Sequence, residues 1–283
     1  MNASLFVCTL AAIALPLILA LPATAQHSCC DAPAKFAALG GSGAFRMAHK
    51  LPAAGYSYAG AGESITFSTP DGGTSTAFVV RGKTSETGGK VIVMIHEWWG
   101  LNDYIKREAA ATADSLGDVT VIAVDLYDGK VAATREDAAK FMQGVSAKRA
   151  EAILRGVFAY AGAAARIGTI GWCFGGGWSL RAAIAAGAHA RACVMYYGMP
   201  ETDQAKLQTL SAPVLGIFAG RDKWITPAVV GQFETAAAAA GVRLAVQSYD
   251  ADHAFANPSS PKFDEAARAD ARSRTLAFFR KYL

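Results

Sequence analysis

The sequence predicts an α/β fold with a mostly parallel central sheet and helices on both faces. From residue 91 onwards, short apolar runs alternate with longer helical stretches. The run at residues 91–95 is apolar throughout, which is typical of a strand buried on both faces of a sheet. Strands that alternate with helices favour parallel pairing, because each crossover returns the chain to the same edge. No internal repeat interrupts the pattern, so we expect one domain over residues 61–283.

The same pattern places each element along the chain. We expect strands at 91–95, 119–124, 167–170, 192–196, 214–218 and 244–249, and helices at 103–115, 149–164, 227–240 and 265–282. Two β-branched runs, at 64–68 and 76–80, flank a Pro-Asp-Gly-Gly turn and predict a hairpin before the domain's parallel strands.

The overall composition restricts the classes of partner. Of the 283 residues, 52% are hydrophobic and 18% charged, which is typical of a globular protein. The net charge of +4 is mild, and no dense run of Lys and Arg occurs, so we expect no nucleic-acid partner. We expect a small-molecule lactone or ester substrate and a monomer or small homo-oligomer.

The first 25 residues differ from the rest, since they contain no Asp, Glu, Lys or Arg. Their apolar run ends just before Ala23 and Ala25, which fit the small-residue pattern of a signal-peptidase site. We therefore expect a signal peptide at 1–25, export to the periplasm or beyond, and no stable membrane insertion after its removal. An uncleaved anchor is the alternative. Residues 26–60, rich in Ala, Gly and Ser, are expected to form an irregular linker.

The strongest local signal is Gly-Trp-Cys-Phe-Gly-Gly-Gly at 171–177, between a predicted strand and a helical stretch. It has the form Gly-x-nucleophile-x-Gly, a sharp turn that presents the nucleophile at the carboxyl edge of a sheet. We expect Cys173 to be an exposed thiolate, stabilised by the helix N-terminus. The alternative is a buried structural cysteine. The other cysteines are too scattered to predict a disulfide framework.

A cysteine nucleophile needs a base, and histidine is the usual one. Of the five histidines, His253 directly follows the last predicted strand, where this kind of fold places its catalytic histidine. His27 and His49 precede the predicted domain, and His189 lies near a helix end. His96 fits a packed or solvated position better than a catalytic one. We predict that His253 is the base, with a surface-loop position as the alternative.

The acid that orients the base should lie between nucleophile and histidine in chain order. Asp222 satisfies this order in the exit loop of the strand at 214–218. Asp250 and Asp252 are close to His253 in sequence and stay open as competing candidates. A plain helix-capping role is the other alternative for Asp222.

Two further features belong to loops at the same edge. The loop after the strand at 91–95 normally supplies one backbone N–H of an oxyanion hole, and Phe174, next after the cysteine, would supply the other. Glu97 is a charged residue that ends an apolar strand, so we expect it to face the site.

Six blocks in order along the chain carry a resemblance. They are His-Glu-Trp-Trp-Gly at 96–100, Asp-Leu-Tyr at 125–127, Gly-Trp-Cys-Phe-Gly-Gly at 171–176, Tyr-Tyr-Gly at 196–198, Gly-Arg-Asp at 220–222 and Asp-His-Ala-Phe-Ala at 252–256. Together they resemble the dienelactone hydrolase (carboxymethylenebutenolidase) family of the α/β-hydrolase superfamily, over residues 64–283. The resemblance implies hydrolysis of lactones or activated esters. It implies these roles: a triad of Cys173, His253 and Asp222, a thiol contact from Glu97, and oxyanion N–H groups on Trp98 and Phe174.

The resemblance also implies arginines that hold a substrate carboxylate. One position falls on Arg135, but Asn257 stands at the other, so the family's substrate does not carry over with the triad. No metal and no organic cofactor is implied. The alternatives are a broader carboxylesterase or thioesterase with the same triad, and a non-catalytic ligand-binding protein on the same scaffold. A redox protein that uses Cys173 ranks last, because no Cys-x-x-Cys is present.

Overall fold

An eight-stranded sheet forms the centre of the protein in the computed structural model, which describes Met1 and residues 31–52, 56–85 and 89–283. Apart from Met1, the expected signal peptide at 1–25 lies outside the described residues. The strands are β1 (Glu63–Ser68), β2 (Thr74–Arg81), β3 (Lys90–Ile95), β4 (Val119–Val124), β5 (Arg166–Trp172), β6 (Ala190–Tyr196), β7 (Val214–Ala219) and β8 (Leu244–Tyr249).

The strand order is β1-β2-β4-β3-β5-β6-β7-β8. β1 and β2 form the expected antiparallel hairpin, and β2 pairs antiparallel with β4. Every other neighbouring pair is parallel. Because parallel strands end at the same edge, the loops that follow β3, β5, β7 and β8 meet there. The predicted α/β fold is confirmed.

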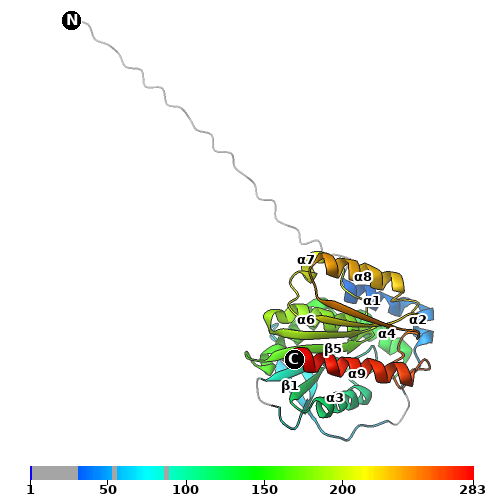
Figure 1. The fold of residues 1–283 in the computed structure, drawn as a ribbon. Coiled ribbons are helices and arrows are strands. Elements are labelled where there is room, and N and C mark those ends of the chain that lie inside the picture. Colours follow the sequence, from blue (N-terminus) through cyan, green and yellow to red (C-terminus); the bar gives the residue numbers. More distant parts are fainter. Residues whose placement is uncertain (2–30, 53–55, 86–88) are drawn as a thin grey trace.

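Helices cover both faces of this sheet, as Figure 1 shows. They are α1 (Ala32–Ala38), α2 (Gly43–Ala48), α3 (Asp103–Leu116), α4 (Arg135–Gly144), α5 (Ala147–Ala161), α6 (Phe174–Ala186), α7 (Gln204–Leu207), α8 (Pro227–Ala239) and α9 (Glu265–Tyr282), with short 3₁₀ turns at Leu39–Gly41 and Gly187–His189. Helices α3 and α9 pack together on one face, while α5 and α6 pack together on the other. Among the described residues, no helix has the length and apolar character needed to cross a membrane.

Burial along the strands follows their apolar runs. All of β7 is buried, as expected of a strand inside a parallel sheet, whereas every position of the edge strand β8 is exposed or half-buried. The core therefore lies along the central strands.

The expectation of an irregular segment at 26–60 is wrong for its described part between 31 and 50. That stretch forms α1, a 3₁₀ turn and α2, and it buries Phe36 and Phe45 completely. The Ser42 hydroxyl caps α2 by accepting a hydrogen bond from the Phe45 backbone N–H. Helices this short gain their stability from packing and not from propensity, so the local sequence carries little signal for them.

Candidate active site

The turn around Cys173 joins β5 to α6. Cys173 has φ 57° and ψ −119°, a backbone conformation that L residues rarely adopt. A Cβ atom on Gly171 would overlap the carbonyl oxygen of Gly175, and one on Gly175 would overlap that of Ile95. The flanking glycines thus allow the close backbone approach that the strained turn requires. Such strain costs on the order of 1–3 kcal/mol and is typical of functional positions.

The thiol at this turn is buried, with 1% of Cys173 exposed. Backbone N–H groups of Phe174 and Trp98 donate hydrogen bonds to its sulfur. Burial, and then the charge of Glu97, raise the thiol pKa well above its usual value despite these bonds. The expectation of an exposed thiolate is therefore wrong for this state: the group is a buried thiol, held by the two expected oxyanion donors.

His253 and Asp222 form a direct pair. His253 Nδ1 lies 2.6 Å from Asp222 Oδ2, and both side chains are buried. Burial raises the pKa of Asp222, but the His253 charge and the hydrogen bonds outweigh burial and leave it below its usual value. The other carboxylate oxygen accepts the backbone N–H groups of Trp224 and Ile225, at 2.8 and 3.0 Å. This loop therefore fixes the carboxylate at both oxygens.

The competing acids contact other groups. Asp250 pairs with Arg221 at 2.5 Å, and Asp252 lies 3.8 Å from Arg221 and 3.7 Å from Lys262. The helix α8 is capped by Thr226, so Asp222 is not its N-cap residue. Of the three candidate acids, Asp222 is the one at hydrogen-bonding distance from His253.

Glu97 lies at the same edge and is also buried. Burial raises its pKa from 4.5 to about 7, against the opposing effects of His253 and of a hydrogen bond from Asn257. The Asn257 amide nitrogen lies 2.5 Å from Glu97 Oε2. The residue at the second expected arginine position therefore binds a protein carboxylate.

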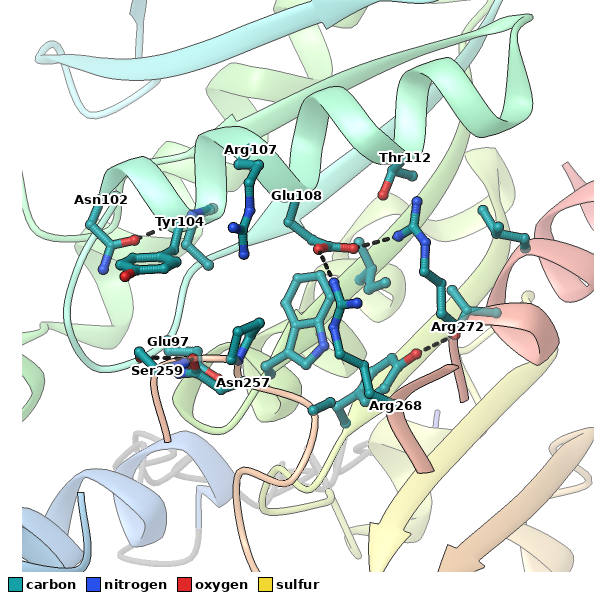
Figure 2. A pocket seen from close by; sticks show the side chains of 18 residues that line it. Glu97, Asn102, Tyr104, Arg107, Glu108, Thr112, Asn257, Ser259, Arg268 and Arg272 are labelled. Carbon is teal, nitrogen blue, oxygen red and sulfur yellow. Dashed lines mark hydrogen bonds and ion pairs between the residues drawn. The ribbon is translucent and has the colours of Figure 1, made fainter. Parts of the chain in front are cut away.

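A separate cavity lies between α3 and α9, and Glu97 and Asn257 form one end of its wall (Figure 2). Glu108 crosses it to pair with Arg268 at 3.0 Å and Arg272 at 2.5 Å. Cys173, Asp222 and His253 are absent from its lining.

His49, expected to precede the domain, lies inside the site. Its ring centroid is 5.4 Å from that of His253 and 4.6 Å from that of Trp98. Nδ1 lies 2.7 Å from the Phe45 carbonyl oxygen. Burial, followed by the charge of His253, lowers the His49 pKa to about 3, so the ring is neutral near pH 7. The one sequence signal for this placement is the i, i+4 spacing of Phe45 and His49 after the capping residue Ser42.

We call residues 31–50 the N-terminal cover, because they pack over the triad. Phe36 and Phe45 lie with ring centroids 6.2 and 6.4 Å from that of His253. Arg135, expected to bind substrate, donates from Nε to the backbone oxygen of His49 at 2.6 Å. Arg135 thus fastens the cover in this state.

The fold and this arrangement define a class of protein. A cysteine on a strand-to-helix turn, a His–Asp pair from later loops and two converging N–H groups are typical of α/β-hydrolases. The sequence profile of the dienelactone hydrolase family matches residues 76–283, so the chain belongs to that family and is a hydrolase.

Two relatives and one solved structure illustrate the similarity. A carboxymethylenebutenolidase of Pseudomonas sp. is 30% identical over 68% of this chain and 85% of its own. Protein usf of Aquifex pyrophilus is 29% identical over 71% of this chain and 91% of its own. A dienelactone hydrolase-like promiscuous phosphotriesterase from metagenomic libraries shares the fold, with TM-score 0.67, 23% identity, and coverage of 79% and 99% of the two chains.

Proposed function

We propose that this protein hydrolyses lactones or activated esters with Cys173 as nucleophile, His253 as general base and Asp222 as the acid that orients it. The observation that carries the proposal is the convergence on one thiol of a His–Asp pair and two backbone donors. Because the Asp222 carboxylate can only accept, His253 Nδ1 carries the ring proton and donates a hydrogen bond to it. His253 Nε2 is therefore unprotonated and can accept a proton.

In the proposed reaction, the Cys173 thiol proton passes to His253 Nε2 as the sulfur attacks the acyl carbonyl carbon. The sulfur turns away from the Phe174 and Trp98 N–H groups, which then bind the new oxyanion. One such donor contributes roughly 3–4 kcal/mol to the transition state. His253 gives its proton to the leaving enol or phenol oxygen, and water activated by the same ring then releases the acid from the thioester.

The substrate we propose is a neutral ester or lactone, as in the broader esterase alternative. The specific observation is that neither expected carboxylate-binding position is free. Arg135 binds the His49 backbone, and Asn257 binds Glu97. An anionic substrate would find no free guanidinium at either position.

Turnover of neutral aryl esters, neutral enol lactones and their carboxylated analogues tests this proposal. We expect activity in the wild type, none above background in Cys173→Ala, and a thioester on Cys173 detectable by mass spectrometry of quenched samples. Cys193→Ala is the matched control, since Cys193 is a buried cysteine in β6 outside the site. Full activity of Cys173→Ala would refute the cysteine mechanism, and a strong preference for the carboxylated lactone would refute the neutral substrate.

A further inference from the structure

Three side chains that can bind a metal ion converge at the triad. One ring nitrogen each from His49 and His253, and the Cys173 sulfur, all lie within 4.8 Å of one another, and all three residues are buried. In tetrahedral zinc sites, bond lengths of about 2.0–2.3 Å place ligand atoms roughly 3.4–3.6 Å apart. Shifts of about 1 Å or less in side-chain position therefore suffice to bring the three atoms onto one ion.

Both imidazoles present a free lone pair. The Nε2 atoms of His49 and His253 are buried and have no hydrogen-bond partner. Each Nδ1 is held by an oxygen that only accepts, the Phe45 carbonyl for His49 and the Asp222 carboxylate for His253. Each Nδ1 therefore carries the ring proton, which leaves Nε2 as the ligand atom. Such outer partners are typical of metal-binding histidines.

The donor set and its charge select the kind of ion. Two imidazoles and one thiolate suit zinc and exclude magnesium and calcium, which prefer oxygen ligands. A doubly charged ion would balance the Cys173 thiolate and the Asp222 carboxylate in a buried place. A cavity whose lining includes His49, Trp224 and His253 adjoins both imidazoles.

We propose that Cys173, His49 and His253 form a binding site for one zinc ion, which inhibits the hydrolase and fastens the N-terminal cover over the triad. Binding releases the thiol proton of Cys173 to solvent and changes no oxidation state. The ion engages the sulfur and the base together, so the covered enzyme is inactive until a chelator removes the metal.

Cobalt titration of the full-length protein tests the site directly. Cys8, His27, Cys29 and Cys30 are themselves metal-ligand types, so the background carries Cys8→Ser, His27→Ala, Cys29→Ser and Cys30→Ser. We expect one equivalent of Co²⁺ with a thiolate charge-transfer band, displaced by Zn²⁺. Cys173→Ala should abolish the band.

If metal affinity depends on His49, the ion is bound by all three residues and not by Cys173 and His253 alone. His49→Gln should weaken binding roughly a hundredfold or more, since even outer-partner losses reach that scale. His189→Gln, at an exposed histidine, is the matched control and should bind as the background does. Absence of the band, or equal affinity of His49→Gln and the background, would overturn the proposal.

X-ray absorption spectroscopy of zinc bound to the background protein tests the site even if the His49→Gln variant does not fold. We expect one sulfur at about 2.3 Å and two imidazole nitrogens at about 2.0–2.1 Å. Two sulfurs, or a single imidazole, would overturn the site. None of these binding measurements requires turnover, so they test the zinc site even if the proposed hydrolase activity is not found. Inhibition by zinc and recovery with chelator are measured only on active enzyme.

Discussion

Cys173 combines a strained backbone with a protonated, buried side chain. The positive φ angle is maintained by β5 and α6 on either side of the turn, and the flanking glycines make room for it. Its thiol pKa is raised by burial and by Glu97. The resting group is therefore a poor nucleophile by itself, and in the proposed mechanism it is activated by transfer of its proton to His253.

At this scale, Asp222→Asn tests the proposed role of Asp222 in orienting His253. The asparagine Oδ1 can still accept from Trp224 and Ile225, so the loop should keep its structure. Its amide nitrogen, however, cannot accept the His253 Nδ1 proton, which forces the wrong tautomer. We expect kcat/KM for an aryl ester to fall by about 10⁴ with the unfolding temperature nearly unchanged.

The matched control for that variant is Asp250→Asn. Asp250 is exposed and pairs with Arg221, so its loss should leave the rate close to that of the wild type. The assignment of Asp222 would be wrong if its asparagine variant kept wild-type activity while Asp250→Asn or Asp252→Asn lost it.

At the scale of elements, the N-terminal cover packs over the triad. Its two short helices are held by the buried rings of Phe36 and Phe45 and by the hydrogen bond from Arg135 to His49. A few contacts of this kind can open locally without unfolding the sheet. We infer that substrate reaches Cys173 when the cover moves aside.

Phe45→Ala tests this role of the cover. Loss of a fully buried phenylalanine costs about 3–5 kcal/mol, here mostly from docking of the cover. We expect the alkylation rate of Cys173 by iodoacetamide, followed by mass spectrometry, to rise roughly a hundredfold. Labelling of Cys193, buried in the sheet, should stay low and report on global unfolding.

The matched control is Phe279→Ala, which removes an equally buried ring from α9. It should lower global stability without a selective rise at Cys173. Equal labelling of Cys173 in the two variants would show that the cover does not control access.

For the molecule as a whole, Glu97 couples folding stability to pH. Its pKa in the folded state is raised to about 7 by burial, from 4.5. The folded protein therefore keeps this proton at pH values where the unfolded chain has lost it. The stabilisation from Glu97 is fully present below pH 4.5 and is lost as the pH rises through about 7.

The measurement is urea unfolding of wild type and Glu97→Gln across this pH range. Because glutamine does not titrate, the variant should become more stable relative to wild type as the pH rises, by up to about 3 kcal/mol. Glu136→Gln, at an exposed glutamate of α4, serves as the control. A difference between wild type and Glu97→Gln that is flat with pH would contradict the burial argument.

We further propose that the protein is exported, on the basis of the uncharged apolar residues 1–25. Expressed in a Gram-negative host, the full chain should yield a periplasmic protein whose first residue is near Gln26. N-terminal sequencing of the fractionated cells gives the answer. An intact Met1 on cytoplasmic protein would reject the proposal.

The sequence by itself determined the sheet and the chain order of the candidate site. Apolar runs such as β7 are buried on both faces, so their composition alone identifies strands of a parallel sheet. Parallel strands end at a common edge, so Cys173, Asp222 and His253, each placed after a strand, had to lie near one another. Local pattern sufficed because these residues depend on the elements that immediately precede them.

Only the tertiary structure decided what surrounds that site. The short helices of the cover carry no strong period, so local pattern was too weak to place His49 beside His253 or Arg135 on the His49 backbone. Burial of the Cys173 thiol follows from the same packing, and burial in turn raises its pKa. Desolvation depends on every group that excludes water, including segments far away in sequence. The burial and the pKa of Cys173 can therefore be known only from the folded structure.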